Sequence, residues 1–254
     1  MAAKPRLESV LFVPDTHRPY HDPKAWSLLL SVGKALKPSH LMILGDFCDF
    51  YCVSAHSKDP TRATQLETEL ADVRRGLDDL DALGATDKRY CGGNHEDRLT
   101  RYLQDKAPEL FESVTIPGLL GLEDRGWRYV PYKHDTRLGK LYLTHDVDNA
   151  GRYATFKALD AYQHSVVTGH AHRMCYVVEG NAVGEHKLSA QFGWLGDAEA
   201  IDYLHRVRVR KDWALGFGIG YLDTKTSIVY ATPVPIITKG STYSCVVNGD
   251  LYTA

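Results

Sequence analysis

Residues 10–46 read VLFVPDTHRPYHDPKAWSLLLSVGKALKPSHLMILGD, and this stretch decides the fold. It opens with a short apolar run at 10–13 and closes with a second one at 41–44, each the length of a buried strand. Between them, Asp22 is a candidate N-cap and Pro23 occupies the first helical position of an apolar helix that extends to Leu36. Two strands joined by a helical crossover predict the start of a parallel α/β sheet.

The same alternation continues along the chain. Apolar residues at spacings of three and four predict a helix over 61–83, followed by a strand at 88–91 and a short helix at 96–104. A loop rich in Pro and Gly is predicted at 117–126. Further strands are predicted at 127–130, 141–144 and 165–168, with a helix before the last one that places Tyr153, Phe156, Leu159 and Tyr162 on one side.

The character of the chain changes at about residue 174, where strands follow one another without helices. They are predicted at 175–178, 187–192, 215–222 and 227–232, and the polar tail at 239–254 has no predicted structure. We therefore expect a single α/β domain over residues 1–254 with a β-rich C-terminal portion from about 174.

Composition excludes several classes of protein. Thirty Lys and Arg against 32 Asp and Glu give a net charge of −2, so no overall field attracts nucleic acid or a membrane surface. The apolar runs are far shorter than the roughly 20 residues that span a bilayer, and no membrane partner is expected. Five cysteines cannot all pair, and residues 1–14 do not resemble a signal peptide, so we expect a reducing, cytoplasmic setting.

Polar side chains of one chemical kind follow five predicted strands. They are Asp15 and His17, Asp46 and Asp49, Asn94 and His95, His145 and Asp146, and His170 and His172. Because loops beyond the carboxyl ends of parallel strands converge on one crevice, these side chains can meet there. Carboxylate, amide and imidazole donors without thiolate suit transition metals. The set is too large for one ion and sufficient for two, with Asp46 as the best bridging carboxylate.

Five short motifs carry a resemblance to a known family. Asp15-Thr16-His17, Gly45-Asp46 with Asp49, Gly93-Asn94-His95-Glu96, His145, and Gly169-His170-Ala171-His172 resemble, in order and spacing, the calcineurin-like metallophosphoesterases over residues 10–172. Phe50-Tyr51, residues 94–99 and residues 193–197 further resemble members encoded by phages and prophages, which would act in the host cytoplasm.

The resemblance implies a fold and a set of roles. The fold would be an α/β/β/α sandwich, with two β-sheets packed face to face and helices on both outer sides. One divalent transition metal would be held by Asp15, His17, Asp46 and His172, and a second by Asp46, Asn94, His145 and His170. Mn²⁺ is the first choice, with Fe, Zn, Co or Ni as alternatives. A water or hydroxide between the metals would be the nucleophile, and His95, oriented by Asp49, would be the general acid.

The substrate contacts are less sharply indicated. Protein phosphatases of this superfamily follow the second carboxylate with an Arg-Gly pair that grips the phosphate, whereas Asp49 is followed here by Phe50-Tyr51. This argues against a protein serine/threonine phosphatase. It leaves the phosphate to other groups, for which the candidates are Arg98, Arg173, His56 and Lys58, although a solvated surface charge is the better explanation of each.

A basic segment offers a route to a nucleic-acid partner. If residues 206–211 are extended, Arg206, Arg208 and Arg210 share one face and would track a phosphate backbone, with Tyr203 and Trp213 as stacking platforms. The alternatives are a solvated strand face or a subunit contact.

Together these patterns predict a two-metal phosphoester hydrolase that acts on monoesters or diesters. A DNA nuclease of the same superfamily is the first alternative. A catalytically inactive, metal-stabilised binding or regulatory protein is the second. A metal-dependent amidohydrolase fits the motif at 93–96 poorly, and neither a Gly-x-Ser-x-Gly nucleophile nor a phosphate-binding P-loop is present.

Overall fold

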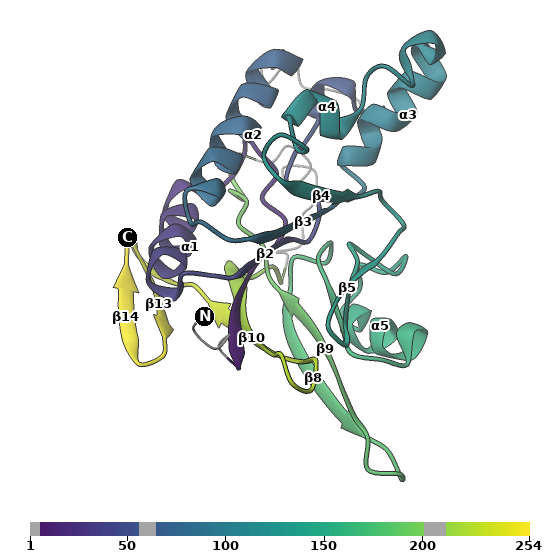
Figure 1. The fold of residues 1–254 in the computed structure, drawn as a ribbon. Coiled ribbons are helices and arrows are strands. Elements are labelled where there is room, and N and C mark those ends of the chain that lie inside the picture. The colour runs from purple at the N-terminus through teal and green to yellow at the C-terminus, as the bar shows by residue number, and fades with distance from the viewer. Residues whose placement is uncertain (1–5, 56–64, 201–211) are drawn as a thin grey trace, which may run out of the picture.

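A computed structural model describes residues 6–55, 65–200 and 212–254 (Figure 1). Its largest sheet has six strands in the order β11-β10-β1-β2-β3-β4. Four of them are parallel, namely β1 (Leu7–Val13), β2 (His40–Ile43), β3 (Asp87–Cys91) and β4 (Trp127–Val130). The antiparallel strands β10 (Gly216–Asp223) and β11 (Ile228–Pro235) extend it beyond β1.

A second sheet has five strands in the order β5-β6-β7-β9-β8. Its centre is the parallel set β6 (Leu141–Leu143), β7 (Val166–Thr168) and β9 (His186–Phe192). The antiparallel strands β5 (Thr136–Leu138) and β8 (Met174–Gly180) form its two edges.

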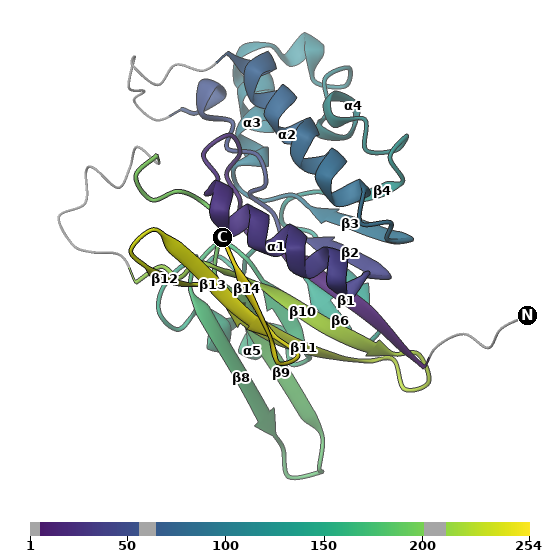
Figure 2. The same cartoon turned by 90° about the vertical axis from the view of Figure 1, so that its left-hand side faces the viewer.

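Alternate residues of β1 enter two different cores, because successive side chains of a strand point to opposite faces. Val10 and Phe12 pack with Leu143 and Phe192 of the five-stranded sheet. Leu11 and Val13 belong to the core beneath the helices α1 (Pro23–Leu36), α2 (Leu66–Asp81), α3 (Glu96–Lys106) and α4 (Ile116–Leu120). Figure 2 shows α1 and α2 above the six-stranded sheet, with β8 and β9 below it.

The helix α5 (Ala154–Tyr162) contacts β7, β8 and β9 of the five-stranded sheet. The predicted arrangement of two packed sheets flanked by helices is thus confirmed. Two 3-10 helices, η1 (Tyr51–Val53) and η3 (Pro108–Leu110), lie in the connections. Among the described residues, no helix has both the length and the apolar character needed to cross a membrane.

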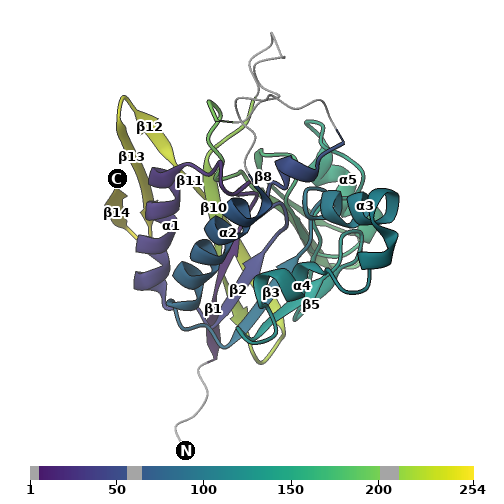
Figure 3. The same ribbon diagram turned by 90° about the horizontal axis from the view of Figure 1, so that it is seen from above.

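The structure departs from the sequence prediction in the polar tail, which forms a third sheet of β12 (Ile237–Lys239), β13 (Thr242–Val247) and β14 (Asp250–Thr253). In Figure 3, β13 and β14 lie beside α1. Only alternate residues of β13 are buried, with Cys245 and Val247 in the core and Val246 exposed. The strand therefore looks polar in sequence because one face meets solvent.

Two helical predictions also need correction. In α5 the buried residues are Ala154, Thr155, Ala158 and Leu159, whereas Tyr153 and Phe156 are exposed. Small residues let the helix lie close to the sheet, and the large rings point outward. The predicted loop at 117–126 contains most of α4, whose first turn is capped by the Thr115 hydroxyl.

Candidate metal centre

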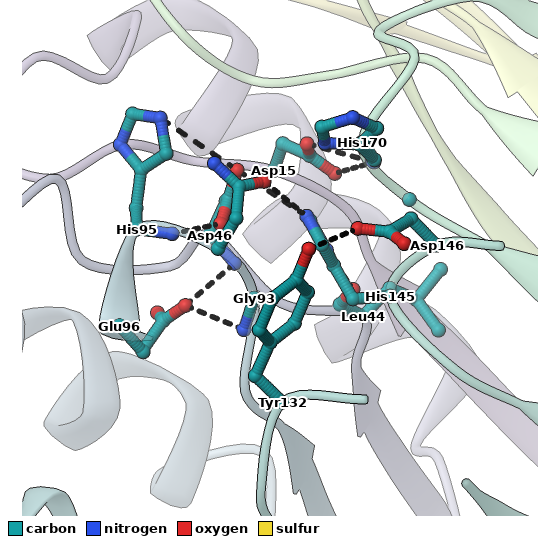
Figure 4. Close-up of polar contacts among 12 residues, drawn as sticks. Asp15, Leu44, Asp46, Gly93, His95, Glu96, Tyr132, His145, Asp146 and His170 are labelled. Carbon is teal, nitrogen blue, oxygen red and sulfur yellow. Dashed lines mark hydrogen bonds and ion pairs between the residues drawn. The ribbon is translucent and has the colours of Figure 1, made fainter. Parts of the chain in front are cut away.

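The loops that follow β1, β2, β3, β6 and β7 bring their polar side chains together at one edge of the two sheets (Figure 4). In the first group, one ligand atom from each of Asp15, His17, Asp46 and His172 lies within 4.8 Å of the others, and all four residues are buried. His172 Nε2 is 3.0 Å from Asp15 Oδ2 and 3.0 Å from His17 Nε2. Imidazole nitrogens and a carboxylate oxygen thus converge on one point.

A second group consists of Asp46, His145 and His170, again within 4.8 Å of one another. His145 Nε2 lies 3.3 Å from Asp46 Oδ2 and 3.1 Å from Asn94 Oδ1. The Nδ1 atom of His145 donates to the carbonyl oxygen of Leu44 at 2.8 Å, which leaves Nε2 to face the group. Asp46 belongs to both groups, as a bridging ligand must.

The backbone at these positions adopts a rarely populated conformation. Asp46, His17, His170 and His172 all have φ between 48° and 69°, in the left-handed region. Such residues carry strain of roughly 1–3 kcal/mol each and gather at functional sites. Gly93 shows how tightly the loops approach, because a Cβ there would lie 2.1 Å from Asp46 Oδ1.

The electrostatics of the centre favour cations. Burial would raise the pKa of Asp46, but His145 and His95 outweigh it and hold that pKa well below the usual range. Burial lowers the pKa of His145, yet the Asp46 carboxylate overrides this and raises it to about 10. The buried carboxylates stay ionised and draw positive charge to themselves. A set of carboxylate, imidazole and amide donors of this kind could hold metal ions.

His95 lies beside this cluster and is held by Asp49 and Arg98. Its Nδ1 is 3.2 Å from Asp49 Oδ2, and Arg98 Nη2 lies 2.9 Å from its Nε2. Because a guanidinium only donates hydrogen bonds, Nε2 accepts from Arg98 and Nδ1 carries the proton toward Asp49. His17 joins Asp49 and His95 in a third compact group, with its Nδ1 3.3 Å from Asp49 Oδ2.

The other substrate-contact candidates have different surroundings. Arg98 also donates to Asp49 Oδ1 at 3.1 Å, so it belongs to the centre. Arg173 is bound to the Asp212 carboxylate at 2.5 and 2.9 Å and to the carbonyl of Ala150 at 2.6 Å. The predictions for His56 and Lys58, and for Arg206, Arg208 and Arg210 with Tyr203, fall outside the described residues.

Sequence reasoning missed the residue that supports the Asp46 loop. The Glu96 carboxylate accepts five hydrogen bonds, from the N–H groups of Asp46, Phe47, Cys48 and Gly93 and from the hydroxyl of Tyr90. Glu96 belongs to the motif at 93–96, so the sequence shows where it lies but not which groups it binds.

A second missed support lies next to His145. The Tyr132 hydroxyl donates to Asp146 Oδ2 at 2.7 Å, and its ring meets the His145 ring edge-on with centroids 6.0 Å apart. Tyr132 follows the carboxyl end of β4. Loops beyond the carboxyl ends of parallel strands converge on one crevice, and this rule, which located the other site residues, therefore also points to the loop of Tyr132.

Comparison with known proteins gives only a distant likeness. No protein-family model and no curated protein matches the chain. Among solved structures, the chain is similar to vacuolar protein sorting 29 from Cryptosporidium parvum, with a TM-score of 0.48 and 14% identity over 98% of this chain and 97% of that one. It is also similar to a single mutant of Vps29 from Entamoeba histolytica (0.39, 12%, 97% of each chain) and to TT1561 of Thermus thermophilus (0.40, 10%, 89% and 99%). At these TM-scores the likeness decides neither the family nor the activity of the chain.

Proposed function

We propose that the chain is a metal-dependent phosphoester hydrolase that resembles the calcineurin-like metallophosphoesterases and cleaves phosphomonoesters or phosphodiesters. One observation supports this above the others. Asp46 belongs to two compact donor groups, one completed by Asp15, His17 and His172 and the other by His145 and His170. A carboxylate with two oxygens can bridge cations roughly 3.5–4 Å apart, the separation used in two-metal phosphoryl chemistry.

The first ion would be held by Asp15, His17, Asp46 and His172, and the second by Asp46, Asn94, His145 and His170. When bound, such a pair of divalent ions supplies Lewis acidity that activates water near neutral pH and neutralises charge on the phosphoryl oxygens. Mn²⁺ is the ion we propose first, with Fe, Zn, Co or Ni as alternatives that the same donors accept. Cys48 lies two residues after Asp46, and its sulfur is 3.3 Å from the Tyr90 hydroxyl. Burial raises the pKa of this thiol well above its usual value, so the sulfur stays protonated.

His95 would donate the proton that a departing alkoxide needs. To do so it must carry a proton on Nε2, the atom that accepts from Arg98 in the structure. A phosphoryl oxygen is a stronger acceptor for a guanidinium than a neutral imidazole is. Arg98 would therefore turn to the substrate phosphate as it enters and leave Nε2 free to take a proton from solvent, while Asp49 would stabilise the doubly protonated ring from its Nδ1 side.

Arg98 would thus bind the substrate phosphate, which is the role of the arginine of the Arg-Gly pair in protein phosphatases. It lies two residues into α3, and its contacts with Asp49 hold it at the edge of the centre. Arg173 is less suited to this role, because its guanidinium pairs with Asp212, whereas Arg98 pairs with Asp49 and His95 of the centre itself.

The test is a panel assay of metal-loaded protein on a phosphomonoester, a phosphodiester, cyclic nucleotides and single-stranded DNA. His172→Ala removes a member of the first donor group. His164→Ala is its matched control, because the His164 ring stacks on Tyr142 and belongs to none of the three groups. We expect metal-dependent hydrolysis that His172→Ala abolishes and His164→Ala retains.

The outcomes separate the alternatives. Fastest cleavage of single-stranded DNA would favour the nuclease and a role for Arg206, Arg208 and Arg210. Binding of two ions without hydrolysis of any substrate would favour a metal-stabilised binding or regulatory protein and overturn the proposed activity.

A further inference from the structure

The segment Gly193-Trp194-Leu195-Gly196 lies against two of the three loops that supply the first donor group. The N–H of Leu195 donates to the carbonyl of Asp15 at 2.7 Å. The N–H of Trp194 donates to the carbonyl of Ala214, whose own N–H donates to the carbonyl of His172. The segment is therefore bonded directly to the Asp15 loop and, through Ala214, to the His172 loop.

The ring of His172 lacks the polar support that a metal-binding histidine usually has. Such a histidine normally donates its second ring N–H to a carboxylate, a carbonyl or a water, which fixes the ring. His145 follows this rule through the carbonyl of Leu44 at 2.8 Å. The Nδ1 atom of His172 is buried and has no hydrogen-bond partner among the described residues.

Two tryptophans take up the space around that ring. Trp194 stacks on His172 with centroids 4.9 Å apart and an interplanar angle of 14°. Trp213 meets the same ring at 80° with centroids 4.3 Å apart, and it also contacts Trp194 at 4.8 Å. Trp194 is only 2% exposed, and a Cβ at Gly196 would lie 2.2 Å from its ring, so Trp194 has little freedom to move.

We propose that Trp194 and Trp213 form an aromatic cradle that positions His172 as a metal ligand in place of the usual hydrogen bond. The inference rests on the proposed metal centre and deepens it. It assigns different supports to the two ions: ring packing at the first, and the hydrogen bond from His145 to a backbone carbonyl at the second. Loss of the cradle should weaken the first site and spare the second.

The experiment measures the affinities of both sites by titrating Mn²⁺ and Zn²⁺ into metal-free protein and by metal analysis against a graded chelator. In Trp194→Leu we expect one affinity to fall about 10–100-fold, the usual effect of losing an outer-shell support. The other should stay within about twofold of the parent, by the same reasoning that its own support is untouched. Trp194→Phe keeps a stacked ring and should restore most of the loss.

Trp127→Leu is the matched control for a merely structural effect. Trp127 is 4% exposed, donates to Asp81 and packs in the core beneath the helices. Its replacement should lower the melting temperature without changing the ratio of the two affinities. If Trp194→Leu does not fold, Trp213→Leu decides the question at a half-buried position, with a loss at the same site expected.

The results distinguish failure of the cradle from failure of the centre. A parent protein that binds two ions, with both affinities unchanged or equally reduced in Trp194→Leu and Trp213→Leu, overturns the cradle and leaves the centre in place. A parent protein that binds neither Mn²⁺ nor Zn²⁺ overturns the centre, and the cradle with it.

Discussion

Replacement of Glu96 by glutamine tests what holds the Asp46 loop in position. Glu96 is fully buried and has two oxygens, one facing the N–H groups of Asp46 and Gly93 at 2.9 and 2.7 Å. The other oxygen accepts from two further N–H groups and from a tyrosine hydroxyl. Glutamine has nearly the same shape but turns one of these acceptors into a donor.

The magnitude follows from the donors left without an acceptor. If the amide nitrogen takes the place nearest Asp46 and Gly93, two buried N–H groups lose their partner, at roughly 1–3 kcal/mol each. The expected loss is therefore about 2–6 kcal/mol, out of the roughly 5–15 kcal/mol by which a domain is usually stable. Even the lower limit of ~2 kcal/mol corresponds to a fall in melting temperature of about 4–8 °C for a chain of this size.

The assay is thermal and urea unfolding of metal-free protein, with Glu69→Gln as the matched control. Glu69 is equally buried and binds the N–H of Phe50 in the same loop. Burial and the nearby Asp49 raise its pKa to about 8, so Glu69 is largely neutral at pH 7 and glutamine resembles it closely. We expect a small loss for Glu69→Gln and a large one for Glu96→Gln. Equal losses would refute the argument that both Glu96 oxygens are needed as acceptors to organise the loop.

Three further predictions concern other parts of the molecule. Asp46→Asn should lower the occupancy of both metal ions, because this carboxylate lies in both donor groups, and metal analysis of the purified protein checks it. His95→Ala should keep both ions and lose about 10²–10⁴-fold in rate on an alkyl phosphoester, but less on a nitrophenyl ester whose leaving group departs unprotonated; similar losses on both would argue against the acid role. Burial lowers the pKa of His40, but hydrogen bonds to Asp87 and Glu8 outweigh it and raise the pKa. The stability that His40 adds is then complete below its unfolded pKa of roughly 6.5 and is lost as pH rises through the higher folded value. The difference in melting temperature between the parent and His40→Gln should thus be larger at pH 6 than at pH 9.

The positions of the candidate ligands follow from the sequence because two local rules fix them. Apolar runs locate the strands, and parallel strands bring their carboxyl ends to one edge. Asp15 comes two residues after β1, and Asp46 three residues after β2. Neither rule requires knowledge of distant packing, so the donor set can be gathered before any coordinates exist.

The third sheet and the orientation of α5 do not follow from such rules. In β13 the burial of Cys245 and Val247 depends on α1, which lies some 200 residues earlier in the chain. In α5 the side that meets the sheet is chosen by Ala154 and Ala158, whose small size permits close approach, and not by the larger rings of Tyr153 and Phe156. Hydrophobic periodicity measures apolar character along a helix and does not measure how near a neighbour can come.

The residues that support the candidate metal ligands are harder still to predict from the sequence, because their role depends on which residues they contact in the folded chain. Glu96 looks ordinary in sequence, since acidic residues are common in the first turn of a helix, where they complement its dipole. Three of its five partners are N–H groups that precede it by 48 to 50 residues. Trp194 likewise reads as one more apolar residue after β9 until the ring of His172 is found stacked on it. Metal ligands are limited to a few residue types and can be recognised by type and spacing, whereas any residue of suitable shape can hold a ligand in place. Mutations at such supports should therefore change the affinity of the centre without altering a single donor atom.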